Sequence, residues 1–138
     1  MPFVVSILDG VGYAGLDEPR ATRLFVAALS HRSLNLERVG EVSVALVDAE
    51  TIQDLNARFR GKDEPTDVLS FEVDGPYGDM VGEVVVCPAC ASPFMGVEEL
   101  VVHGALHLSG MDHGEDFEGS VMARVQEAVM GEVRGEGG

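Results

Sequence analysis

The sequence predicts a single domain of the α+β class, with a small mixed sheet packed against helices. The length of 138 residues is typical of one domain, and residues 1–138 show no linker, repeat or low-complexity segment. The composition, 46% hydrophobic and 24% charged, is that of an ordinary globular protein. Alternating β-branched segments are interspersed with segments of helical periodicity, and few strand–helix–strand units occur. These three observations favour strands and helices that share one hydrophobic core.

The N-terminal half is predicted to fold as strand, helix, strand and helix. Residues 3–8 are short and β-branched, which favours a strand. Apolar residues recur at helical spacing over residues 20–31 and predict an amphipathic helix. Residues 41–47 alternate in polarity and predict a second strand. Asp48 then offers an N-cap for a helix that ends at Gly61.

The C-terminal half is predicted to contain two strands followed by two helices. Residues 68–73 and 81–86 have strand character and flank a turn-rich segment at 74–79, so we expect them to be neighbours. Residues 97–108 carry an apolar face and predict a largely buried helix. A last amphipathic helix is expected from about Asp116 onward.

The chain carries a large excess of acidic residues. Against 9 Lys and Arg stand 24 Asp and Glu, a formal net charge of −15. A broad basic surface for non-specific nucleic-acid binding is therefore excluded, and any such contact must be local. No apolar run approaches the ~18 residues of a membrane span, and no signal peptide is evident. We expect a cytoplasmic protein, with no membrane partner, whose two cysteines are reduced thiols.

Three of the four histidines lie close together, in the segment from His103 to His113. His103 and His107 are one helical turn apart, so both imidazoles project from one face of the helix. Gly110 can end the helix with a positive φ, and the reversal would let His113 approach as a third ligand. Three histidines with a fourth position open to water are typical of catalytic zinc, so we expect one Zn²⁺ per chain. The alternative is that these are separate core or surface histidines.

The histidine spacing is also that of the metzincin peptidases, H-E-x-x-H-x-x-G-x-x-H, with one difference. Gly104 occupies the position of the glutamate that takes a proton from the attacking water in those enzymes. Peptide hydrolysis by the usual route is therefore disfavoured. The remaining chemistry is polarisation of a carbonyl or phosphoryl oxygen, or delivery of a metal-activated hydroxide.

Two long motifs resemble the YbeY-type endoribonucleases, which are bacterial rRNA maturation factors. His103-Gly-Ala-Leu-His-Leu-Ser-Gly-Met-Asp-His113 matches H-G-x-L-H-L-x-G-x-D-H, and Leu55-Asn-Ala-Arg-Phe-Arg-Gly-Lys-Asp-Glu-Pro-Thr-Asp-Val-Leu-Ser-Phe71 matches L-N-x-x-[YF]-R-x-x-D-x-x-T-D-V-L-S-F. The resemblance implies a single-domain α+β fold with a zincin-like helix and one zinc on His103, His107 and His113. It also implies a metal-dependent endoribonuclease that cleaves single-stranded RNA in 16S rRNA maturation and ribosome quality control. A ribosomal protein or the small ribosomal subunit is the further partner that it suggests.

The same resemblance implies that Arg60 acts at the active site. Arg58, Arg60 and Lys62 form a local basic island in an acidic chain, and a guanidinium can contact phosphate oxygens through two N–H groups. The alternative for each of these residues is a solvated helix face. Two positions depart from the family pattern: Glu83 replaces the usual aspartate, and the segment 91–102 before His103 is shorter than in the family.

Three further features allow more than one interpretation. Cys87-Pro-Ala-Cys90 could be a redox pair or half a zinc site, but buried thiols at a strand end are favoured because no second C-x-x-C occurs. Asp112 either orients an imidazole or shapes the turn. His31, at a helix end, is expected to be a surface or capping histidine.

Two other functions stay open on the sequence alone. One is a zinc hydrolase of peptides or small acyl substrates, with Asp112 or Glu83 as an unrecognised base. The other is a non-catalytic ribosome-binding module in which zinc only holds the last two helices together.

Overall fold

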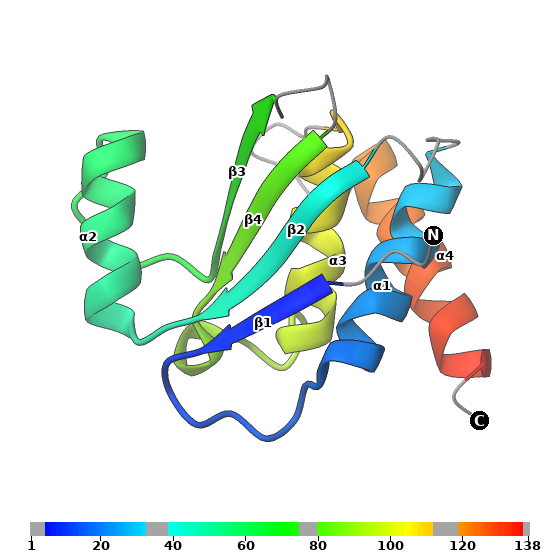
Figure 1. Ribbon diagram of the computed structural model, residues 1–138, viewed down its shortest axis with the longest axis horizontal. Coiled ribbons are helices and arrows are strands. Elements are labelled where there is room, and N and C mark those ends of the chain that lie inside the picture. Colours follow the sequence, from blue (N-terminus) through cyan, green and yellow to red (C-terminus); the bar gives the residue numbers. More distant parts are fainter. Residues whose placement is uncertain (1–4, 33–38, 75–79, 112–118, 137–138) are drawn as a thin grey trace.

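In the part of the chain that the structure describes, four strands form one mixed sheet in the order β1-β2-β4-β3 (Figure 1). The computed structural model describes residues 5–32, 39–74, 80–111 and 119–136. Strand β1 pairs parallel with β2, β2 pairs parallel with β4, and β3 pairs antiparallel with β4. The strand bounds are β1 Val5–Asp9, β2 Val39–Leu46, β3 Val68–Asp74 and β4 Met80–Val86. The predicted neighbour relation between residues 68–73 and 81–86 is therefore confirmed.

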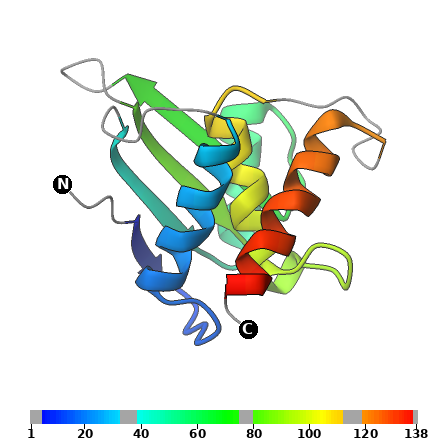
Figure 2. The same cartoon turned by 90° about the vertical axis from the view of Figure 1, so that its right-hand side faces the viewer.

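Within the described residues, helices α1, α3 and α4 pack against one another on one side of the sheet (Figure 2). Helix α2 lies on the other side, beyond β3 (Figure 1). The helix bounds are α1 Glu18–His31, α2 Ala49–Arg60, α3 Val97–Leu108 and α4 Val121–Glu136, with a short 3₁₀ turn at Pro88–Cys90. The predicted α+β class, a small mixed sheet with helices, is confirmed.

Alternation along the strands decides which helix covers which face. On β4, Val84 and Val86 join the large core with α1, α3 and α4, whereas Val85 joins a smaller cluster with Ile52 of α2. Successive side chains of a strand point to opposite faces, so this division follows from the two-residue period. One face of the sheet is thus covered by a helical layer, and the other only in part by α2.

Local capping signals set the helix starts. Asp17 accepts a hydrogen bond from the Arg20 backbone N–H at 2.8 Å, and Asp48 accepts one from Thr51 at 2.8 Å. Both are N-caps of the kind that short acidic side chains supply. Helix α4 begins later than expected: Gly119 and Ser120 precede the helix, and the Ser120 hydroxyl accepts from the Ala123 N–H at 3.1 Å. Asp116, the predicted start, lies outside the described residues, but the prediction that Gly119 and Ser120 are already helical was wrong, because apolar periodicity does not locate a serine cap.

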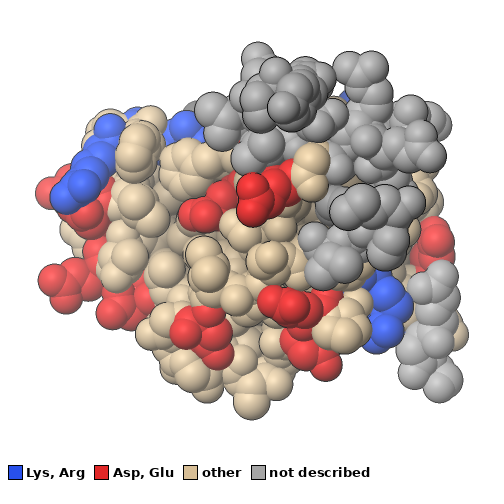
Figure 3. Space-filling model, viewed as in Figure 1, with Lys and Arg blue, Asp and Glu red and all other residues tan. Residues whose placement is uncertain are grey.

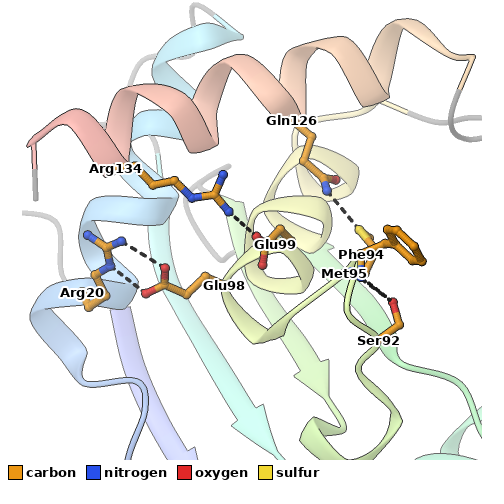
Figure 4. Close-up of polar contacts among 8 residues, drawn as sticks. All are labelled: Arg20, Ser92, Phe94, Met95, Glu98, Glu99, Gln126 and Arg134. Carbon is orange, nitrogen blue, oxygen red and sulfur yellow. Dashed lines mark hydrogen bonds and ion pairs between the residues drawn. The ribbon is translucent and has the colours of Figure 1, made fainter.

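Ion pairs tie the outer helices to α3, as Figure 4 shows. Arg20 of α1 donates Nε and Nη2 to the Glu98 carboxylate at 2.7 and 3.0 Å, and Arg134 of α4 pairs with Glu99. The hydrogen bond from Arg20 lowers the pKa of Glu98 below its usual value. No helix within the described ranges is long and apolar enough to cross a membrane.

Candidate functional site

The two histidines of α3 face one another in space. His103 Nε2 and His107 Nε2 are 3.1 Å apart, and the two rings meet at 70° with centroids separated by 4.7 Å. His103 is buried at 7% exposure, and His107 is half-buried. The helical spacing therefore does bring these two predicted side chains together.

The other ring nitrogen of each histidine contacts an oxygen. His103 Nδ1 lies 3.0 Å from Gln126 Oε1, and His107 Nδ1 lies 3.0 Å from the Met111 carbonyl oxygen. Carbonyl oxygens only accept hydrogen bonds, so each Nδ1 is the donor. In a neutral imidazole the proton then sits on Nδ1, which leaves a lone pair on Nε2.

Two lone pairs that face each other at 3.1 Å repel unless a cation lies between them. A shared proton or a metal ion relieves that repulsion. With Zn–N bonds of about 2.0–2.1 Å, two corners of a tetrahedral zinc site lie about 3.3 Å apart. The donor set and the spacing of His103 and His107 therefore fit two ligands of a zinc ion.

The end of α3 holds the Met111 carbonyl in place. Gly110 has φ of 99°, and the Gly110 and Met111 N–H groups donate to the carbonyls of His107 and Leu106 at 3.0 and 3.1 Å. This is the Schellman arrangement, which turns the chain back over the last helical turn. The prediction that Gly110 ends the helix with a positive φ is confirmed.

The third expected ligand, His113, and its neighbour Asp112 lie outside the described residues. Within the part of the chain that the structure describes, no group of three His, Cys, Asp or Glu side chains could hold a metal. The described site is therefore a pair of histidines, and a third ligand from His113 stays a prediction.

A cleft of ≈ 520 Å³ joins the histidine pair to Arg60. Arg60, at the end of α2, donates Nη2 to the Ser70 carbonyl at 2.7 Å, and its guanidinium carbon lies 5.2 Å from the centre of the Phe71 ring. Its side chain is thereby fixed across the free edge of β3. The cleft is lined by Arg60, Val68, Leu69, Ser70, Glu72, His103, His107, Leu108, Gly110 and Met111.

Gly104 lies where α3 approaches the sheet most closely. A Cβ added there would lie 2.4 Å from Val84 Cγ1, a distance that real Cβ atoms do not show. The Ser70 hydroxyl also donates to the Gly104 carbonyl at 3.2 Å. A side chain at this position, including the peptidase glutamate, would overlap Val84, so the packing of α3 on the sheet favours glycine.

Several other residues that the sequence singled out lie elsewhere. Glu83 is on the opposite face of the sheet, where it accepts from the Ser43 hydroxyl at 3.1 Å. Arg58 pairs with Asp54 on exposed helix surface, and His31 pairs with Glu132 at 2.8 Å as a surface histidine. Of the basic island, the cleft lining includes Arg60 and neither Arg58 nor Lys62.

The cysteines form no part of the cleft. Cys87 is a buried free thiol at the end of β4, and Cys90 is a half-buried one. A hydrogen bond with Cys87, together with burial, raises the pKa of the Cys90 thiol to about 11. The expectation of buried thiols at a strand end is confirmed for Cys87, and the raised pKa disfavours a reactive thiolate at Cys90.

Two residues of the site were missed by sequence reasoning. Glu72 lines the cleft from β3, and Gln126 contacts His103 from α4. A signal for Gln126 was present, because it is a polar residue within the apolar stripe of its helix. No such signal marked Glu72, because its neighbours in the strand, Phe71 and Val73, gave no indication of a cleft.

Comparison with known proteins gives evidence on the family of this chain that is independent of the site geometry. Residues 13–134 match the family model described as endoribonuclease YbeY. A Rubrobacter xylanophilus protein named endoribonuclease YbeY is 65% identical over 98% of this chain and 99% of its own length, and one from Lactobacillus gasseri is 30% identical over 93% and 87%. A solution structure from Thermotoga maritima shares 31% identity and a TM-score of 0.52, over 96% of this chain and 90% of that one. The chain belongs to the endoribonuclease YbeY family.

Proposed function

We propose that this protein is a zinc-dependent endoribonuclease that cleaves single-stranded RNA in the cytoplasm, during 16S rRNA maturation and ribosome quality control. Family membership supports the endoribonuclease role. The observation that carries the zinc dependence is the pair of Nε2 lone pairs, 3.1 Å apart, in a cleft that also holds Arg60.

His103 and His107 would hold the metal, with His113 as the expected third ligand. When bound, zinc supplies Lewis-acid polarisation of a phosphoryl oxygen. The protein's own contribution begins with ring orientation, since the Nδ1 hydrogen bonds of both histidines keep their Nε2 lone pairs directed into the cleft.

Arg60 is assigned the binding of the scissile phosphate. Its contact with the Ser70 carbonyl uses one of the five N–H donors of the guanidinium, so donors remain for phosphate oxygens. The Phe71 ring and the Ser70 carbonyl fix the guanidinium in advance. A donor held in this way can stabilise the negative charge that develops in phosphoryl transfer.

The acidic surface bears on how RNA is bound. Figure 3 shows acidic side chains spread over the described part of the open sheet face, with basic ones at its two ends. With a net charge of −15, the chain gains little long-range attraction for RNA. We therefore assign the docking of rRNA in part to a ribosomal protein or to the small subunit.

The peptidase alternative is disfavoured by two contacts. Gly104 is packed against Val84, and Glu83, one of the two candidate bases, faces the other side of the sheet. The other alternative, a non-catalytic ribosome-binding module that contains zinc, is distinguished by a cleavage assay.

The experiment combines metal analysis with cleavage assays on the purified protein. We expect about one zinc per chain and endonucleolytic cleavage of a single-stranded RNA, with little cleavage of the matching duplex and none of casein. Chelation should stop cleavage, and added zinc should restore it, while circular dichroism shows a retained fold. Cleavage that persists without metal would contradict the zinc dependence. A protein that binds zinc and RNA but does not cleave would be the non-catalytic module.

A further inference from the structure

We propose that Gln126 is a positioning residue, whose side-chain carbonyl holds His103 in the tautomer that leaves its Nε2 lone pair facing the cleft. The proposal deepens the zinc site and rests on the proposed function only for the identity of the cation. The contact joins α3 and α4 through two residues that are 23 positions apart in sequence, with 3.0 Å between His103 Nδ1 and Gln126 Oε1.

The burial of Gln126 indicates that its polarity has a use. Helix α4 packs on the core through an apolar stripe made of Met122, Val129, Met130 and Val133. Gln126 lies within that stripe at 6% exposure. A buried amide costs free energy unless it is hydrogen-bonded, and an apolar side chain would serve packing alone.

The amide is oriented by a second contact. Gln126 Nε2 donates to the Met95 sulfur at 3.2 Å (Figure 4). A thioether sulfur can only accept, so the NH₂ group faces Met95 and the carbonyl oxygen faces His103. Met95 is held in turn by its N–H, which donates to the Ser92 hydroxyl at 3.0 Å. The short segment before α3 thus sets the direction of the glutamine.

The tautomer matters because a neutral imidazole has one donor and one acceptor nitrogen. Without an acceptor at Nδ1, the His103 proton can move to Nε2 and be donated to His107 Nε2, 3.1 Å away. That internal hydrogen bond would use both nitrogens that face the cleft. Gln126 disfavours this state by stabilising the proton on Nδ1.

The test compares Gln126→Met, which keeps the size but replaces the carbonyl oxygen with a much weaker sulfur acceptor, with Gln126→Glu, which keeps an acceptor oxygen. Met130→Leu is the matched control, since Met130 lies in the same buried stripe of α4. Long-range ¹H–¹⁵N correlation spectra of the full-length, zinc-free protein report the His103 tautomer. Competition with a chromophoric chelator reports zinc affinity.

We expect the Nδ1–H tautomer in the wild type, in Met130→Leu and in Gln126→Glu. In Gln126→Met the Nε2–H form should appear and zinc affinity should fall by about 10–100-fold, the usual effect of removing such a partner. An unchanged tautomer in a folded Gln126→Met protein would overturn the proposal, as would equal loss in Gln126→Glu and Gln126→Met. If the wild type binds no zinc, the proposed function fails, yet the tautomer comparison still decides the role of Gln126.

Discussion

Two clefts lie on opposite faces of the sheet and differ in how their polar groups are used. The first, the histidine cleft, gathers two imidazoles, Glu72 and Arg60 between α3 and β3. The second, of ≈ 750 Å³, is mainly apolar and includes the aromatic side chains of Phe59 and Phe71. Its carboxylate from Glu83 is already hydrogen-bonded to Ser43.

The difference between the two clefts shows that neighbouring residues of one strand can contribute to chemically different sites. Ser70 lines the histidine cleft and Phe71 lines the second cleft, although they are adjacent in sequence. The same holds on β4, where Val84 packs against α3 and Glu83 faces away. Because β-strand side chains alternate between faces, two residues that are adjacent in sequence can belong to different sites.

We expect the largest effect from the removal of both imidazoles. His103→Ala with His107→Ala should abolish zinc retention and reduce RNA cleavage to the rate of uncatalysed RNA, because both described donors are removed. Zinc content, single-turnover cleavage and circular dichroism are measured together. Retention of stoichiometric zinc by a folded double variant would place the metal elsewhere in the chain.

Removal of the guanidinium should have the next largest effect. Arg60→Ala is expected to slow single-turnover cleavage by ~10²–10³, the usual result of losing one preorganised donor, while zinc content stays unchanged. Arg60→Lys should recover only part of the rate, because an ammonium cannot form the same planar contacts. Arg58→Ala is the control and should cleave within a few fold of the wild type. Equal effects at both positions would mean that Arg60 acts only through the general charge of α2.

A pair of glycine substitutions tests the contact between α3 and the sheet. Gly104→Ala should destabilise the fold by ~1–3 kcal/mol, because its Cβ would overlap Val84. Gly131→Ala in α4 should instead stabilise it by ~0.5–1 kcal/mol, since no atom lies within 4 Å of the added Cβ. Urea unfolding of both variants gives the two values. A neutral Gly104→Ala would show that the helix and sheet can separate at little cost.

The smallest effect is expected in the second cleft. Glu83→Gln should keep zinc content and the cleavage rate on a short single-stranded RNA within a few fold, because Glu83 faces away from the histidines. The same assay used for Arg60→Ala provides the direct comparison. A loss of cleavage by more than 10-fold with the fold intact would show that the second cleft also contributes to RNA cleavage.

The sequence by itself determined those features that depend on near neighbours in the chain. Strand alternation, the Asp48 cap, the positive φ of Gly110 and the shared face of His103 and His107 each involve residues a few positions apart. Interactions over such spacings follow from backbone geometry, so a pattern can predict them.

Only the tertiary structure decided which distant residues meet. The packing of Gly104 on Val84, the reach of Arg60 across β3 and the contact of Gln126 with His103 all join separate elements. The sequence alone marks Gly104 as the position of a missing base, whereas the structure shows that close packing against Val84 of β4 favours a glycine there. Such contacts depend on how helices dock on the sheet, and docking is set by the complementary shapes of many buried side chains at once, which no local pattern specifies.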